Sequence, residues 1–459
     1  MNVAASRLVP PRIVPPEQPL RGLAFLGAFV RNPLEVVPRA VYEQDLFVNP
    51  AGKMQRLWVT APELVKAVLL DERDKYRKQS QIRLLSPLLG KGILTSEGED
   101  WKWQRQASAP LFRHQDLLGF VPTFVRACDA LLARWRAAGA GAVQPVDRDM
   151  TRATFDVISA TLLPSADKTV GPAVERAMGM FQRAGGWNML LAMLGVPRWV
   201  PRPGMFDTAR AIVLLRSATQ AMLRESRASA NAAGAEGDDL MRRLMRARDP
   251  DTGRAMNDEQ IVDNLLTFYL AGHETTARAL AWTLFLLSRS PDWSALLEDE
   301  IERVTGGQPV RSEHVDKLVL VQQVIKESMR LFPPVPLLAR QAVAPARLGG
   351  LDIVPGATVV MPIYAIHRHA RRWDEPDVFD PTRFAPEREA KIARYQYLPF
   401  GAGPRICIGM AFAMLEATVM LATLLQHARF SPAGDADPLP VANVTLHPKN
   451  GLPLRVHPR

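Results

Sequence analysis

Cysteines and long apolar runs are scarce in this sequence. The chain has two cysteines, Cys128 and Cys407, among 459 residues. Two cysteines cannot build the disulfide scaffold of a small secreted domain, so we expect a reducing, cytoplasmic compartment. The longest apolar stretch near the N-terminus, 23–30, is far shorter than the roughly 18 residues of a membrane span. It also lacks the flanks of a signal peptide, and we expect no membrane span.

The segments that usually divide a chain into domains are missing too. There is no Gly/Ser-rich linker and no low-complexity block, and we find no repeat with a period of about 20–50 residues. A chain of this length could hold about three domains. These absences favour one α-rich domain over residues 1–459, with 1–40 as an extended, proline-rich lead-in.

Acidic residues are outnumbered by basic ones. Lys and Arg number 57 and Asp and Glu number 47, which gives a net charge of +10. A basic chain can bind nucleic acid, but the basic residues here are interleaved with acids, and the densest cluster, HRHARRW at 367–373, is short. We therefore favour a solvated basic surface over nucleic-acid binding. A docking face for an acidic protein partner is a further interpretation, because opposite charges steer encounter.

The strongest helical pattern predicts one long helix over 257–290. Asn257 can cap its start and Pro291 stops it. The pattern is apolar on nearly every face except at HETT, 273–276. A helix that is apolar all round is buried, so we expect this one to cross the domain.

The other patterns predict a mainly α fold with a small β portion. Short strands are expected within 339–366, an exposed loop over 231–239, and a terminal hairpin that turns at Asn450-Gly451. Apolar residues recur at helical spacing over 115–138, 150–162, 208–228, 238–247, 315–331 and 410–430.

Cys407 lies in a glycine-rich loop, FGAGPRICIG, at 400–409. Glycine permits close backbone approach to a bound group, or positive φ angles. The cysteine stands just ahead of an apolar helix, whose free N–H groups and dipole favour negative charge, so we predict a lowered thiol pKa. From the loop alone, an inert buried cysteine, a nucleophile and a metal thiolate such as that of haem stay open. A dinucleotide loop fits less well, because Ile406 stands where its third glycine belongs.

The loop matches one known pattern at every defined position. Phe-x-x-Gly-x-Arg-x-Cys-x-Gly is met by Phe400, Gly403, Arg405, Cys407 and Gly409. It therefore resembles the haem-binding loop of the cytochromes P450, the haem-thiolate monooxygenases. The resemblance implies that Cys407 is the axial thiolate on the iron of haem b, with Phe400 packed beside the sulfur.

Four further motifs occur in the family's order, so the resemblance covers roughly residues 40–459. It implies a soluble, bacterial-like cytochrome P450. The expected fold is a helical bundle around a buried haem, with a long central helix and short sheets.

The segment AGHETT, 271–276, resembles the family's oxygen-activation step. By resemblance, Ala271 and Gly272 lie against the haem, Thr275 hydrogen-bonds the oxygen, and Glu274 relays protons to it. From the residues alone, Glu274 and Thr275 are explained equally well as a buried polar pair, satisfied by each other and by the backbone.

Three motifs of charged and aromatic residues complete the set, namely Glu327-x-x-Arg330, FDPTRF at 379–384 with Arg383, and Trp101-x-x-x-Arg105. The spacing of Glu327 and Arg330 places both on one helix face, which in isolation is typical of a surface ion pair. By resemblance, Arg383 joins them in a buried cluster that has a structural role. The spacing of four in Trp101-x-x-x-Arg105 also shares a helix face, and both side chains can donate to carboxylates. By resemblance the haem propionates are bound by Trp101, Arg105, Arg340 and Arg405, with His367 weighed as a further donor.

The implied function is insertion of one oxygen atom from O2 into an apolar substrate, by hydroxylation or epoxidation. Electrons would come from NAD(P)H through a separate ferredoxin and ferredoxin reductase, or a flavin reductase. An acidic ferredoxin would dock near Lys102, Arg113 and Arg405. The alternatives are an H2O2-driven peroxygenase and a non-catalytic haem carrier or sensor.

Substrate contacts are expected from apolar segments of the chain. By resemblance these are the loop before Trp101, the segment 176–205, the helix positions before Gly272, and VPLLA after the proline pair. Within the second segment, 184–195 is interpreted as a mobile apolar lid. Arg83 is the one charge we consider for a substrate carboxylate.

Overall fold

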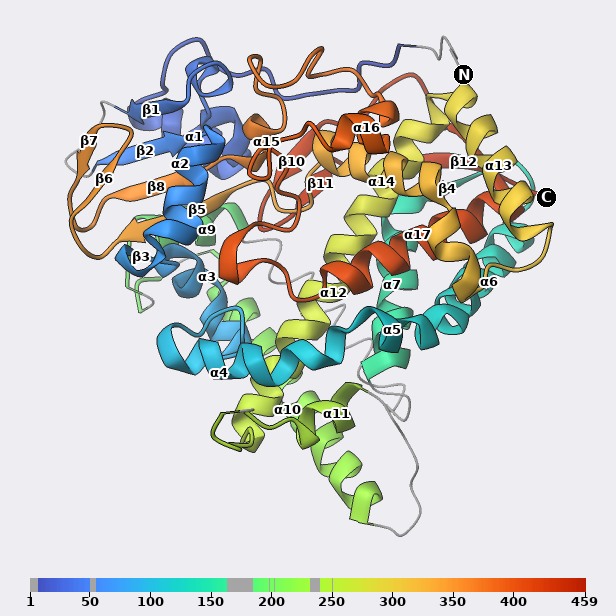
Figure 1. Cartoon of the computed structure of the whole chain (residues 1–459), viewed down its shortest axis with the longest axis horizontal. Coiled ribbons are helices and arrows are strands. Elements are labelled where there is room, and N and C mark those ends of the chain that lie inside the picture. Colours follow the sequence, from blue (N-terminus) through green and yellow to red (C-terminus); the bar gives the residue numbers. More distant parts are fainter. Residues whose placement is uncertain are drawn as a thin grey trace.

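The computed structural model is mainly helical, with small sheets at its edges (Figure 1), which confirms the predicted fold class. Residues 232–239 of the predicted loop 231–239 and part of the predicted substrate segment 176–205 lie outside the described residues. The structure describes residues 7–49, 55–162, 185–197, 199–201, 203–231, 240–249 and 251–459.

Helix α12 (Asp258–Ser288) runs through the centre of the molecule (Figure 1). The Asn257 side chain caps its start by accepting a hydrogen bond from the Gln260 amide at 2.9 Å, and the Gln260 side chain accepts one from the Asn257 amide at 3.1 Å. Most of its side chains are buried. The predicted central helix is therefore confirmed, and Pro291 opens the next helix, α13 (Pro291–Thr305).

Long helices pack around α12 and build one large apolar core. Trp282 of α12 stacks on Phe332 with 4.0 Å between the ring centroids, which fixes the C-terminal part of α12 against the segment after α14. The helices in contact with α12 include α7 (Val146–Leu162), α10 (Met205–Asn231), α14 (Val319–Leu331) and α17 (Met410–His427).

The predicted helices are present, with shifted ends. The pattern at 115–138 is divided by a short 3-10 turn, and 315–331 begins with another, Ser312–Lys317. The remaining described helices are α1 (Gly22–Arg31), α2 (Pro62–Lys66), α3 (Gln79–Leu89), α4 (Gly98–Ser108), α5 (His114–Leu117), α6 (Val121–Ala138), α9 (Gly185–Met193), α11 (Leu240–Arg246), α15 (Ile363–Ile366) and α16 (Pro386–Glu389).

The largest sheet has the strand order β1-β2-β8-β5-β3 and lies at the left of Figure 1. A three-stranded sheet, β4-β12-β9, lies near the C-terminus, and two pairs, β6-β7 and β10-β11, complete the β portion. The strands are β1 (Leu46–Asn49), β2 (Arg56–Val59), β3 (Tyr76–Arg77), β4 (Ala142–Pro145), β5 (Leu338–Ala342), β6 (Ala346–Leu348), β7 (Leu351–Ile353), β8 (Thr358–Met361), β9 (Ala428–Pro432), β10 (Pro440–Ala442), β11 (Leu446–Pro448) and β12 (Pro453–Pro458).

The predicted terminal hairpin is wrong in its pairing. Asn450 and Gly451 do turn the chain, with φ angles of 64° and 87°. However, β11 pairs with β10, while β12 lies between β4 and β9. The amide of Leu452 donates to Asp147 at 2.9 Å, so the chain after the turn is held by a distant helix. The residues Asn450 and Gly451 determine the turn, whereas the distant strands β4 and β9 determine the pairing of β12.

The predicted extended lead-in is also only partly right. Residues 7–21 are largely extended, but α1 follows them. Ala28 and Phe29 of α1 are buried in a small core with Leu190 of α9. This contact with α9, which is far away in the sequence, stabilises α1. The sequence of α1 by itself did not predict a helix.

One described helix, α17, is long and apolar enough to cross a membrane by length and composition. In this structure 67% of its 18-residue window is buried inside the protein. Its apolar side chains belong to the main core cluster, so here it is a core helix.

Candidate active site

A cavity of about 490 Å³ lies between α12, strand β5 and the loop 400–409. Most of the side chains that line it are aliphatic or aromatic. Cavities of a few hundred Å³ with an apolar wall and a few convergent polar groups are the usual form of small-molecule sites. Ala271, Gly272 and Cys407 all line this cavity, so the structure brings the two main sequence motifs together.

The cysteine loop is fixed by its own backbone. The Cys407 amide donates to the Phe400 carbonyl at 3.0 Å, which closes the loop, while the Phe400 side chain packs on the core. Gly403 has a φ of 70°, and a Cβ there would lie 2.3 Å from the Leu69 carbonyl oxygen. Glycine is therefore required at 403. Gly409 then serves as the N-cap of α17.

The Cys407 thiol is open to the cavity. Burial by the surrounding protein raises its pKa, and the Gly409 amide and the Arg105 guanidinium only partly oppose this. The protein groups alone therefore do not produce the lowered Cys407 pKa that the sequence predicts. Desolvation of the thiolate raises the pKa by more than the N–H groups at the start of α17 lower it. A coordinated metal cation deprotonates a thiol outright.

Thr275 and Glu274 are both on the cavity wall, but they are not bonded to each other. The Thr275 hydroxyl donates to the Ala271 carbonyl at 2.8 Å. The Glu274 carboxylate is buried, accepts from the Thr445 hydroxyl at 2.8 Å and lies 3.7 Å from the Arg278 guanidinium. The interpretation as a mutually satisfied pair is therefore wrong. Thr445 was missed because it comes from the β10-β11 turn and has no local signal.

Gly272 has a packing reason for being glycine. A Cβ at this position would lie 3.1 Å from the Ile158 side chain of α7. Ala271 and Gly272 therefore let α7 and the cavity both approach the middle of α12 closely.

A cluster of cations lines the cavity beside the cysteine loop. Arg105 donates to the Ile406 carbonyl at 3.0 Å, and the Arg405 guanidinium lies 4.0 Å from the centre of the Trp101 ring. Burial lowers the pKa of both Arg340 and Arg405 to about 10. The fourth member, Lys78, was missed by the sequence analysis.

Lys78 completes an unbalanced charge distribution. It is buried, and desolvation lowers its pKa well below the usual value, with Arg340 and Arg405 as further causes. Glu97 is the carboxylate that acts on the pKa of Lys78, Arg340 and Arg405. Burial of several cations around one carboxylate favours an anionic ligand beside them.

The residues present therefore suit haem b. Its two propionates carry the negative charge that the cation cluster lacks, and its iron accepts a thiolate such as Cys407 can supply. The apolar walls beside Ala271 and Gly272 suit a flat macrocycle.

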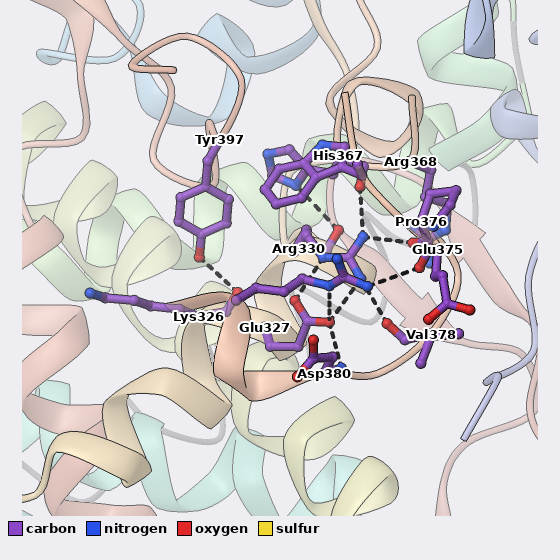
Figure 2. A network of polar contacts seen from close by, with 12 residues as sticks. Lys326, Glu327, Arg330, His367, Arg368, Glu375, Pro376, Val378, Asp380 and Tyr397 are labelled. Carbon is purple, nitrogen blue, oxygen red and sulfur yellow. Dashed lines mark hydrogen bonds and ion pairs between the residues drawn. The ribbon is translucent and has the colours of Figure 1, made fainter. Parts of the chain in front are cut away.

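The predicted Glu327–Arg330–Arg383 cluster is present and buried, and none of its three residues lines the cavity. Figure 2 shows Glu327 and Arg330 at the centre of a network of polar contacts. Arg330 donates to Glu327 through Nε at 2.7 Å and Nη2 at 2.8 Å, and Arg383 lies 3.5 Å from the same carboxylate. The Asp380 amide also donates to Glu327, at 2.8 Å. His367 joins this network through Arg330 and does not line the cavity, so its proposed donation to a propionate is not supported.

The predicted substrate segments line the cavity in part. They contribute Leu84 and Leu88 of α3, Met189 and Met193 of α9, and Leu337. Arg83, considered for a carboxylate, is not among the lining residues and donates to Gln79 at 2.9 Å. Lining residues that the sequence did not indicate come from the N-terminal segment and β2, namely Phe25, Phe29, Arg56 and Trp58.

Comparison with known proteins agrees with this geometry. The family Cytochrome P450 matches residues 19–454. Cyclooctatin synthase of Streptomyces melanosporofaciens is 32% identical over 451 residues, which cover 97% of this chain and 95% of the relative. Pentalenene oxygenase of Streptomyces avermitilis is 29% identical, covering 94% of each chain. The crystal structure of the cytochrome P450DA heme domain superimposes with a TM-score of 0.83 at 28% identity, covering 98% of each chain.

Proposed function

The chain belongs to the cytochrome P450 family of monooxygenases, and from this premise we propose that it inserts one atom of O2 into an apolar organic substrate. The observation that carries the proposal is the cavity itself. Cys407 and the Glu274-Thr275 step open onto one apolar space, with a cation cluster beside it. A thiolate, a proton-handling step and an anion-binding rim are the three parts that this reaction needs from the protein.

Haem b, when bound, would supply the binding and reduction of O2. Cys407 would be its iron ligand, and Trp101, Arg105, Arg340 and Arg405 would donate to its propionates. Lys78 joins this set on the evidence of its burial beside Arg340 and Arg405. The walls against the macrocycle would be Phe400, Gly409, Ala271 and Gly272.

Thr275 and Glu274 are the residues we assign to catalysis. The Thr275 hydroxyl is on the cavity wall and, through its bond to Ala271, has a fixed direction in this structure. The Glu274 carboxylate, held by Thr445 and Arg278, can accept and release a proton inside an otherwise apolar cavity. This acid–threonine pair favours use of O2 over direct use of H2O2, because O2 reduction to water requires protons.

The substrate class follows from the lining. Leucine, methionine and phenylalanine form most of the wall away from Cys407, so burial of an apolar skeleton provides the binding energy. The name of the relative pentalenene oxygenase refers to a polycyclic hydrocarbon. We therefore propose that the protein hydroxylates or epoxidises a substrate with an apolar skeleton.

Electrons would arrive from NAD(P)H through a separate ferredoxin and ferredoxin reductase, or a flavin reductase. Lys102 and Arg113 are exposed next to the cluster that contains Arg105. With a net charge of +10, this face suits an acidic partner. We expect the reaction to take place in the cytoplasm.

Isotope labelling tests the proposal. The reaction under ¹⁸O2 contains the haem-loaded protein, a ferredoxin, its reductase, NADPH and pentalenene. The mass of the product is then measured by mass spectrometry. We expect one ¹⁸O atom per product. Turnover with H2O2 but none with NADPH would indicate the peroxygenase. If haem binds but neither pentalenene nor an apolar carboxylic acid is converted to product, a carrier or sensor is favoured instead.

A further inference from the structure

Arg56 is a cation of the cavity wall that the proposed cofactor does not account for. It lies on β2, where Arg56 and Trp58 face the cavity and Leu57 between them packs into a second apolar core. Its neighbour across the sheet, Thr358 of β8, also lines the cavity. The alternation of side chains along a strand therefore aims Arg56 into the cavity.

Arg56 is separate from the cation cluster assigned to the propionates. That cluster includes Arg340 of β5, and β8 lies between β2 and β5 in the sheet. Two strand spacings place the backbones of β2 and β5 about 10 Å apart. Desolvation alone lowers the pKa of Arg56, with no charged group among the causes, whereas Arg340 and Arg405 both respond to Glu97.

Within the described part of the chain, the half-buried Arg56 guanidinium makes no hydrogen bond or ion pair. Its one specific contact is with the Phe25 ring of α1, at 5.8 Å from the ring centre. Among the described residues that line the cavity, Glu274 is the only one with a carboxylate, and Thr445 and Arg278 already hold it. A partly desolvated, unpaired guanidinium is unfavourable, so a ligand that brought an anion to this position would be stabilised.

We propose that Arg56 binds the carboxylate of the substrate, so that the substrate is an apolar skeleton ending in a carboxylic acid. The inference rests on the proposed function and narrows its substrate class. A guanidinium and a carboxylate match in charge and in their two parallel hydrogen bonds. A phosphate fits less well, since it carries more charge and the neighbouring lining residues, Phe25, Trp58 and Thr358, add no second cation.

The arrangement also assigns an orientation. Arg56 contacts α1, whose Leu23 and Leu26 are exposed, so the carboxylate end lies near the protein surface. Phe29, Leu84 and Met193 line the apolar cavity.

The test uses the haem-loaded full chain and two probes that differ only in their head group, dodecanoate and dodecan-1-ol. Binding is measured by equilibrium dialysis with radiolabelled probes and, in parallel, by the spin-state shift of the haem. We expect dodecanoate to bind at least about tenfold more tightly than the alcohol, the effect of one charge-assisted bidentate contact. Arg56→Gln should remove that preference and change alcohol binding less than twofold, and Arg56→Lys should keep part of it.

Arg347, the exposed middle residue of β6, does not line the cavity, so Arg347→Gln is the matched control and should bind as the wild type does. Equal binding of acid and alcohol by the wild type, or an unchanged preference in Arg56→Gln, would overturn the inference. Tighter binding of dodecyl phosphate would replace the carboxylate with a phosphate. The proposed function fails separately, if the same preparation holds haem without thiolate ligation.

Discussion

Thr275 is the residue whose replacement separates oxygen chemistry from cofactor binding. We predict that Thr275→Ala binds haem as the wild type does but releases H2O2. Without the Thr275 hydroxyl, proton delivery would no longer be directed towards product formation. NADPH consumption should continue while product per NADPH falls at least about tenfold, less than the roughly 10²–10⁴-fold that a general acid–base group contributes to a rate. The measurement compares NADPH consumed, H2O2 released and product formed.

Thr283→Ala is the matched control for that variant. Thr283 lies on the same helix and makes the same type of bond, to the Ala279 carbonyl at 2.7 Å, but it does not line the cavity. It should stay coupled. Tight coupling in Thr275→Ala, or equal uncoupling in Thr283→Ala, would contradict the role given to Thr275.

At the residue scale, motifs predicted which side chains meet at the cavity, but not how each one is held. Cys407, Glu274 and Thr275 were all found from short local patterns. The bond from Thr445 to Glu274 was not, because a turn far along the chain supplies it. Lys78 and Arg56 carry no motif either, and their importance follows from burial, which a sequence does not display.

At the element scale, the buried charge cluster ties α14 to the segment before α16. Removing one partner of a buried ion pair leaves the other charges unpaired, and this destabilises a protein by about 3–5 kcal/mol. We therefore predict that Glu327→Ala lowers the free energy of unfolding by that amount and gives little haem-loaded protein. Glu313→Ala removes an exposed glutamate and should leave the free energy of unfolding close to that of the wild type. A stable, haem-loaded Glu327→Ala protein would contradict the structural role.

His367 makes the same network sensitive to pH. Its Nε2 accepts from the Leu398 amide at 2.8 Å and its Nδ1 lies 3.2 Å from the Arg330 carbonyl, so the neutral ring is the form that fits. Burial, with a further contribution from Arg330, lowers its pKa from 6.5 to about 3. Between these values the unfolded chain binds more protons, so stability falls as pH decreases below about 6.5, by up to about 1.4 kcal/mol per unit.

Urea unfolding at pH 7.5, 6.0 and 5.0 measures this dependence. Replacing the histidine by asparagine, His367→Asn, should lower stability at pH 7.5 but flatten the loss between 6.0 and 5.0. His114→Gln, at the exposed start of α5, should leave the slope unchanged. An equally steep loss in His367→Asn would assign the pH dependence to other groups.

Elements with strong internal patterns were predictable, and elements stabilised by distant partners were not. The central helix α12 has its own cap, a continuous apolar pattern and a terminating proline, all of them local signals. Helix α1 instead depends on burial of Phe29 against α9, and β12 depends on β4 and β9. No pattern within 22–31 or 446–458 contains that information.

At the scale of the whole molecule, the net charge of +10 should govern the encounter with the electron donor. Exposed charges more than about 8 Å apart are largely screened at physiological ionic strength. We predict that the KM for an acidic ferredoxin rises several-fold between 20 and about 300 mM salt, with little change in kcat. Lys102→Glu should raise the KM at low salt. Steady-state turnover that is insensitive to salt would contradict docking by charge.

The sequence predicted the fold class and the proximity of the cysteine loop to the AGHETT segment. It did not predict which residues form the part of the cavity wall that is lined by α1. Residues 7–31 cross from the lead-in to the cavity wall, where Phe25 and Phe29 line it. Long-range packing of this kind decides which apolar residues face a substrate. Substrate class is therefore the part of the account that needed the structure.

The central claim is a haem held by the Cys407 thiolate, and the visible spectrum of the reduced, carbon monoxide-bound protein tests it most directly. We predict a strongly red-shifted Soret band in the wild type, lost in Cys407→Ser but kept in Cys128→Ser, because Cys128 is buried and does not line the cavity. A Soret band at the unshifted position in freshly purified, folded wild type, or no haem band after reconstitution, would contradict it.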